Sequence, residues 1–146
     1  MAPLHEAVAR RLEEQEQRYT PSRRKLVEAL AASGRPLTVP ELLDRLPGLP
    51  QSSAYRNVTA LVEAGVVRRL PTADDHWRVE LAEDISGHHH HLVCASCGRV
   101  EDVPPSATLE RALGETARLV ADRSGFVVNE HRLDLVGTCA ACEAAR

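Results

Sequence analysis

The sequence predicts an α+β protein: an N-terminal winged helix-turn-helix domain and a small C-terminal α/β domain with a zinc site of four cysteines. Three observations lead to this prediction. Helical patterns fill most of residues 1–64, two short strand-like runs follow them, and two Cys-x2-Cys pairs frame the C-terminal part. The 146 residues suit one or two small domains, and we expect two, at 1–81 and 88–146. The stretch 82–87 is acidic, polar and ends in glycine, so it is interpreted as a hinge.

Composition and charge limit the class of protein. No apolar run approaches the roughly 18 residues of a membrane span, and the N-terminus carries no apolar signal-peptide core. We therefore expect a cytoplasmic protein without a membrane partner. The net charge of −3 gives no overall attraction to nucleic acid. Residues 18–78, however, carry 10 Lys and Arg against 6 Asp and Glu, a mild basic zone that is compatible with DNA but not diagnostic of it.

The N-terminal part shows a series of helix signals. Residues 4–17 form a charged helical pattern. A second helix is expected over 21–33, with Thr20 as its N-cap, proline in its first turn and glycine directly after its end. Thr38 and Glu41 have the spacing of a capping box, which predicts the start of a short third helix.

A fourth helical pattern, over 51–64, is followed by strand-like runs at 66–70 and 76–81. Helix, short helix, helix and hairpin in this order are typical of a winged helix, in which the last helix enters the major groove. Its outward face is small, polar and lightly basic, and its candidate DNA contacts are Ser52, Ser53, Tyr55 and Arg56. An arginine and a tyrosine alone would be an ordinary solvated face, and a winged helix can also bind protein.

The C-terminal part alternates strands with one helix. Residues 88–94 and 99–103 are interpreted as strands, 108–124 as a helix that ends at a glycine, and 126–136 as a long final strand.

The four cysteines are the strongest single signal. They form two Cys-x2-Cys pairs, and two such pairs match a tetrahedral thiolate zinc site. Disulfides are the less common use of cysteine in a reducing compartment. A redox dithiol is the alternative, and the presence of two pairs argues against it. A structural zinc is therefore predicted at Cys94, Cys97, Cys139 and Cys142.

Four consecutive histidines, residues 88–91, directly precede the first cysteine pair. Side chains alternate between the two faces of a strand, so His88 and His90 face one way and His89 and His91 the other. Each pair could hold Zn²⁺, Fe²⁺, Ni²⁺ or Mn²⁺ if further ligands complete the shell. The candidates for these further ligands are Glu80, Glu101, Asp102, Glu110 and His131.

The sequence does not predict an enzyme. A zinc hydrolase needs an open coordination position, a base and a substrate pocket, and the motifs that supply them, such as H-E-x-x-H, are absent from the sequence. A shell of histidines and carboxylates across a hinge is better suited to a reversible metal sensor.

Several blocks resemble the ferric uptake regulator (Fur) family of bacterial metal-responsive repressors. They are PQSSAYRNVTALVEAGVV, HHHHLVCASCGRVEDV, EHRLDLVGTC and the last Cys-x2-Cys, and the similarity covers roughly residues 10–142. The resemblance implies a homodimer with an N-terminal winged helix and a C-terminal dimerisation domain. It also implies binding to A·T-rich palindromic double-stranded DNA when a regulatory metal is loaded.

The resemblance also implies roles for individual residues. It places the structural zinc at the four cysteines. It implies a regulatory metal site at Glu80, His89, His91 and Asp102. It implies an additional metal site at His88, His90, Glu110 and His131, where Glu115 is a possible substitute for Glu110. The base-contacting positions are Ser53, Tyr55 and Arg56, and the positions near the DNA backbone or minor groove are Arg18 and Arg23.

The chain departs from the family pattern at one point. Many members supply a histidine ligand from the segment that aligns with residues 34–38, and this chain has none there. His5 or His76 could substitute, or Glu80 is the only ligand before the hinge. No cysteine is left for the regulatory site, which tilts the expected metal slightly from Zn²⁺ toward Fe²⁺, with Mn²⁺ or Ni²⁺ also possible.

These patterns predict a metal-dependent, DNA-binding transcriptional repressor that controls metal homeostasis genes in response to iron or zinc. One alternative is a metal buffer or chaperone without a specific DNA target. Another is a peroxide sensor of the same family, in which bound Fe²⁺ leads to oxidation of a nearby histidine.

Overall fold

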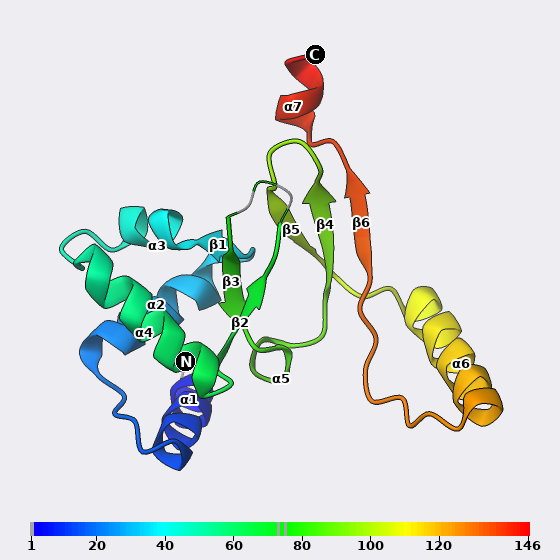
Figure 1. The fold of residues 1–146 in the computed structure, drawn as a ribbon, viewed down its shortest axis with the longest axis horizontal. Coiled ribbons are helices and arrows are strands. Elements are labelled where there is room, and N and C mark those ends of the chain that lie inside the picture. Colours follow the sequence, from blue (N-terminus) through cyan, green and yellow to red (C-terminus); the bar gives the residue numbers. More distant parts are fainter. Residues whose placement is uncertain (1, 73, 75) are drawn as a thin grey trace.

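The computed structural model describes residues 2–72, 74 and 76–146 (Figure 1). The N-terminal part consists of four helices and three short strands. In chain order they are α1 (Ala2–Glu14), α2 (Pro21–Ser33), β1 (Leu37–Thr38), α3 (Val39–Arg45), α4 (Gln51–Glu63), β2 (Val67–Leu70) and β3 (Arg78–Leu81). The C-terminal part follows with α5 (Glu83–Ser86), β4 (His90–Cys94), β5 (Val100–Val103), α6 (Ala107–Ser124), β6 (Asp134–Gly137) and α7 (Ala140–Ala144).

The local signals of the N-terminal part have the expected structural effect. The Thr20 side chain accepts a hydrogen bond from the backbone of Arg23 at the start of α2, and Gly34 ends that helix in the left-handed conformation with φ 66°. Thr38 and Glu41 form a complete capping box at the start of α3. Both predicted helix starts are therefore confirmed.

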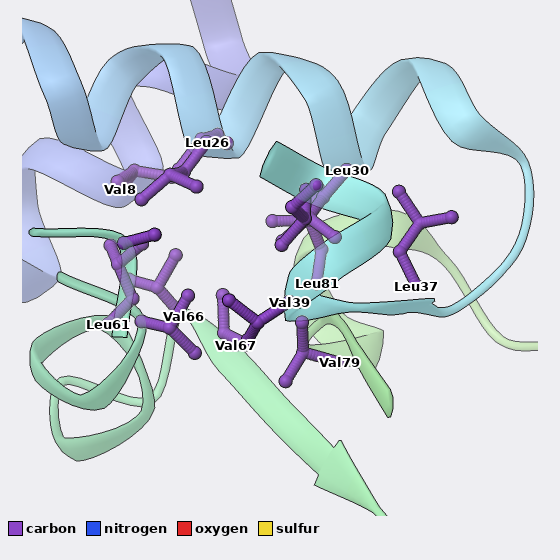
Figure 2. Packing of buried hydrophobic residues seen from close by; sticks show 14 of the residues in the cluster. Val8, Leu26, Leu30, Leu37, Val39, Leu61, Val66, Val67, Val79 and Leu81 are labelled. Atoms are coloured by element: carbon purple, nitrogen blue, oxygen red, sulfur yellow. The ribbon is translucent and has the colours of Figure 1, made fainter. Parts of the chain in front are cut away.

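One hydrophobic core holds the N-terminal part together (Figure 2). Val8 of α1, Leu26 of α2, Leu61 of α4 and Val79 of β3 are at most 1% exposed within it. The helices gather on one side of the antiparallel β1-β3-β2 sheet, and the C-terminal sheet lies on its other side (Figure 1). The buried core cluster ends at Leu81, so β3, which carries Glu80, is anchored in the best-packed part of the molecule.

The C-terminal part is a three-stranded sheet of order β5-β4-β6, with β4 antiparallel to β5 and parallel to β6. Figure 1 shows α6 standing apart from this sheet, joined to β6 by a long connection. None of the residues of α6 is buried. The C-terminal part therefore has little hydrophobic core of its own in a single chain.

The predicted long strand over 126–136 is wrong for most of its length, because β6 spans only Asp134–Gly137. A strand needs a hydrogen-bonding neighbour, and the register of β4 with β6 begins at the pair His91 and Asp134. Residues 126–133 extend beyond the sheet. The expected helices and the first four expected strands are present, with ends that differ by a few residues. The sequence reasoning missed β1, α5 and α7.

The segment expected as a hinge contains the single-turn helix α5. Ile85 packs against the N-terminal core, and Asp84 forms an ion pair with Arg11 of α1. The connection is therefore docked onto the N-terminal part. None of the described helices combines the length and apolar character that crossing a membrane requires.

Replacing Thr38 by alanine should lower the free energy of unfolding by about 1 kcal/mol, because the amide of Glu41 loses its capping partner. Urea denaturation of the metal-loaded protein would measure the effect. The matched control is Thr59→Ala on the exposed face of α4, expected to cost less than about 0.5 kcal/mol. Equal costs for the two variants would mean that the capping box does not stabilise the fold.

Candidate metal centres

The structure brings together four cysteines, the cysteine cluster: Cys94, Cys97, Cys139 and Cys142. Cys94 ends β4, and Cys139 is the N-cap of α7. All four are free thiols. The sulfurs of Cys97 and Cys139 lie 3.8 Å apart, far beyond the roughly 2.05 Å of a disulfide. A tetrahedral zinc with bonds of about 2.3 Å has sulfur–sulfur edges of about 3.8 Å, so the cluster fits a thiolate-bound metal.

Backbone hydrogen bonds position these sulfurs. The amide of Gly98 donates to the carbonyl of Cys94 over 2.9 Å and closes the turn of the first pair. The amide of Cys139 donates to the sulfur of Cys94 over 3.3 Å, and this contact is the main reason why the pKa of Cys94 falls to about 6. The Cys142 thiol donates to neighbouring sulfurs, chiefly that of Cys139, and these hydrogen bonds raise the pKa of Cys142 to about 12. Four clustered thiolates repel one another, and a dication at their centre would remove that cost.

A second group, the hinge cluster, consists of Glu80, His89, His91 and Asp102. Glu80 comes from β3, and the others come from β4, the residue before it, and β5. The Nε2 atoms of His89 and His91 lie 3.0 Å and 3.1 Å from the same oxygen of Glu80. They lie 3.6 Å and 3.9 Å from one oxygen of Asp102. Two imidazoles and two carboxylates thus converge on one point across the junction of the two parts.

The hinge cluster contains a buried carboxylate, Glu80, whose charge is stabilised by its neighbours. Burial, the largest influence, would raise the pKa of Glu80, but hydrogen bonds from two histidines and the Arg68 guanidinium outweigh it and lower that pKa to about 2. Burial also raises the pKa of Asp102. Burial would lower the pKa of His89, but a backbone hydrogen bond and Glu80 raise it. The buried carboxylate is therefore held as an anion, with nitrogen donors drawn toward it.

A third group, the second cluster, consists of His88, His90, Glu110 and His131. Nε2 of His88 lies 2.9 Å from Glu110 Oε2 and 3.0 Å from Nε2 of His131. Nε2 of His90 lies 2.5 Å from the other Glu110 oxygen. Three ring nitrogens thus converge on one carboxylate, a donor set that suits a borderline divalent metal. The alternative acid, Glu115, is not among the groups brought together.

The sequence reasoning missed three residues beside these clusters. Arg68 lies opposite Glu80 in the β2–β3 register and donates to its carboxylate over 2.6 Å; the hairpin pattern could have revealed this pair. Asp134 Oδ1 lies 3.6 Å from His91 Nδ1. Glu83 of α5 contacts Nδ1 of His88, and nothing in the sequence pattern indicated this contact.

The two histidines considered as substitutes for the missing ligand do not reach the hinge cluster. His5 lies 2.6 Å from the hydroxyl of Tyr19 and 3.2 Å from Glu28. His76 is exposed in the loop before β3. Glu80 is thus the one ligand candidate that the described N-terminal residues bring to this cluster.

The candidate DNA contacts gather on and beside α4. Tyr55 is 47% exposed, Ser52 and Arg56 are also exposed, and Ser53 is half-buried. Arg23 donates to Asn57 of α4 over 3.0 Å and to the carbonyl of Arg18 over 2.7 Å. The side chain of Arg23 is therefore held next to the predicted recognition helix, with the backbone of Arg18 beside it.

Comparisons with known proteins agree with this arrangement. The model of the family described as "Ferric uptake regulator family" matches residues 14–136. The peroxide operon regulator of Bacillus subtilis is 29% identical over 129 residues, which are 86% of this chain and 83% of that protein.

Two solved structures have similar folds. The ferric uptake regulator of Helicobacter pylori has a TM-score of 0.73 at 20% identity, and the match covers 97% of this chain and 93% of that one. The ferric uptake regulator of Vibrio cholerae has a TM-score of 0.68 at 26% identity, with 88% and 96% covered. The family model spans most of the chain, and both solved structures have a similar fold. The chain therefore belongs to the ferric uptake regulator family and is a metal-dependent transcriptional repressor, not an enzyme.

Proposed function

We propose that this repressor binds double-stranded DNA as a homodimer when a divalent metal occupies the hinge cluster, and that it controls metal homeostasis genes. One observation carries the proposal. Glu80 belongs to the well-packed N-terminal part, and it meets three ligand candidates that lie beyond α5, with all four ligand atoms within 4.8 Å of one another. A cation bound there would join the two parts of the molecule.

The mechanism is a shift of population. Without a cation, hydrogen bonds between the two imidazoles and Glu80 link the N-terminal and C-terminal parts at this point. A bound cation would hold Glu80 against the histidines and favour one angle between the parts. In a dimer that angle sets the spacing of the two α4 helices, which must match half-sites about 34–36 Å apart on an A·T-rich palindrome.

The exposed apolar surface of the C-terminal part supports a homodimer. Leu119 and Val120 of α6 are 58% and 51% exposed, and Phe126 and Val127 are 73% and 84% exposed. Large apolar side chains exposed in this number favour an interface with another chain. Residues 126–133 also lack a strand neighbour within the described chain, and a second copy could supply one.

We propose Zn²⁺ at the cysteine cluster as a structural ion. The C-terminal part has little core of its own, so the binding energy of this metal would be largely folding energy. Its role would be to tie the end of β4 to α7.

Cys97→Ser should release this metal and lower the melting temperature of the C-terminal part by more than 10 °C, about the effect of losing several kcal/mol. Elemental analysis would measure zinc per chain, and calorimetry the melting. Ser96→Ala, in the same turn, is the control and should keep the zinc content and the melting temperature of the wild type. Unchanged zinc content and melting in Cys97→Ser would exclude the structural role.

The hinge cluster offers two imidazoles and two carboxylates and no sulfur. This donor set suits Fe²⁺, and also Zn²⁺, Mn²⁺ or Ni²⁺. The similarity to the peroxide operon regulator adds a second candidate function, in which Fe²⁺-loaded protein responds to peroxide.

Metal-dependent DNA binding should disappear in His89→Ala and His91→Ala, because each removes a nitrogen ligand next to Glu80. Fluorescence anisotropy would follow binding to DNA from upstream of the protein's own gene, with Fe²⁺ (anaerobically), Zn²⁺, Mn²⁺ and Ni²⁺. The affinity for DNA in the presence of metal should fall at least 10-fold, a typical size for the coupling between two binding sites. Light scattering should still show a dimer. His5→Gln, outside the clusters, should behave as the wild type.

DNA binding that is equal with and without metal in the wild type would contradict the sensor role. Uptake of metal beyond the cysteine cluster without any DNA binding would favour a metal buffer. Hydrogen peroxide added to the Fe²⁺-loaded complex tests the second candidate: release of DNA with Fe²⁺ and not with Zn²⁺ would support it.

Arg56→Ala should weaken specific DNA binding by about 10-fold or more, because a guanidinium on the exposed face of α4 can pair with a guanine edge or a phosphate. Competition against random DNA separates the two roles: a base contact relaxes specificity, and a phosphate contact weakens all sequences alike. Arg111→Ala on α6 is the matched control, with unchanged affinity expected. Wild-type affinity of Arg56→Ala would rule out Arg56 as a DNA contact.

A further inference from the structure

We propose that Glu83 is a positioning residue for the second cluster, and that α5 thereby couples this cluster to the N-terminal part. The coupling to DNA rests on the proposed function, while the positioning role does not. The evidence lies in three consecutive residues of α5, each of which contacts a different part of the molecule: Glu83, Asp84 and Ile85.

Both ring nitrogens of His88 are engaged. Nε2 points into the second cluster, 2.9 Å from Glu110 and 3.0 Å from His131. Nδ1 contacts the carboxylate of Glu83. An Nδ1–H that donates to a carboxylate leaves the lone pair on Nε2, fixes the ring orientation and makes Nε2 a better ligand. Glu83 therefore supports the cluster from behind His88 and adds no ligand atom to it.

The helix that carries Glu83 is fastened to the N-terminal part. Asp84 forms an ion pair with Arg11 of α1, and Arg11 also donates to the carbonyl of Gly65 over 2.6 Å. Ile85 packs against the N-terminal core. Because successive helical residues point about 100° apart, a single turn can face the second cluster, α1 and the core at once. The ion pair of Asp84 therefore links the helix that supports His88 to α1.

Each of the two histidine clusters thus contacts one carboxylate that comes from β3 or from α5, the helix docked onto the N-terminal part. Glu80 enters the hinge cluster directly, and Glu83 reaches the second cluster through His88. A metal in either cluster would favour the same docked arrangement. Thermodynamic linkage then requires that filling the second cluster strengthens DNA binding.

The second cluster is open to ions from solution. A cleft of about 430 Å³ is lined by Glu83, His88, Glu110 and His131, together with Glu130 and two other residues. Glu130 pairs with Arg132 over 2.9 Å and is not part of the cluster. It therefore provides a matched control within the same cleft.

The first experiment measures Zn²⁺ affinity of the full-length dimer, with the cysteine cluster already loaded, by competition with a chromophoric chelator. His90→Ala identifies which binding step belongs to the second cluster. Glu83→Gln should weaken that step by about 10- to 100-fold and leave the hinge-cluster step unchanged. Glu130→Gln should change neither. Equal affinities in Glu83→Gln and Glu130→Gln would overturn the positioning role, whether or not the protein binds DNA.

The second experiment tests the link through α5 with Asp84→Asn, which breaks the ion pair with Arg11 but keeps Glu83. Zn²⁺ affinity at the second cluster should stay within about threefold of the wild type. DNA affinity is measured with the hinge cluster filled, before and after the second cluster fills. In the wild type, filling the second cluster should raise the affinity for DNA about fivefold or more. In Asp84→Asn, filling it should leave the affinity for DNA unchanged. An equal gain in both proteins would overturn the link.

Discussion

The two-residue period of β4 is the constraint on which both histidine clusters depend. Because side chains alternate along an extended segment, His88 and His90 lie together with ring centroids 4.8 Å apart, and His89 and His91 lie together at 4.9 Å. The same strand ends at Cys94 in the cysteine cluster. As the central strand of its sheet, β4 contributes one ligand candidate to each of the three metal centres: His90, His91 and Cys94.

The two parts of the molecule are stabilised differently, and this difference suits a switch. The N-terminal part packs a continuous aliphatic core that ends at Leu81. The C-terminal part has few buried apolar residues, among them Val100 and Cys94, and leaves α6 exposed. We infer that it depends on metal and on a second copy for its structure. One metal that folds this part and another that orients it can change the geometry of the whole molecule at little cost to the N-terminal core.

Polar contacts around Glu80 hold the junction of the two parts and make it sensitive to a bound cation. Glu80 is 6% exposed, and burying its charge is favourable only because Arg68 and two histidines surround it. Loss of either histidine would leave this carboxylate less well compensated. The junction is thus held by charged groups that are stable only when paired. Its geometry should therefore respond to a bound cation more strongly than the geometry of an apolar junction would.

The sequence by itself determined the features that depend on near neighbours along the chain. The cap at Thr20, the capping box at Thr38 and the alternation of the four histidines follow from local geometry, and each is present in the structure. Tertiary structure alone decided which distant groups meet. Glu110 rather than Glu115 meets His88, and β6 begins only at Asp134, where its register with β4 begins. Such choices depend on how separate elements pack in space, and no local pattern records that packing.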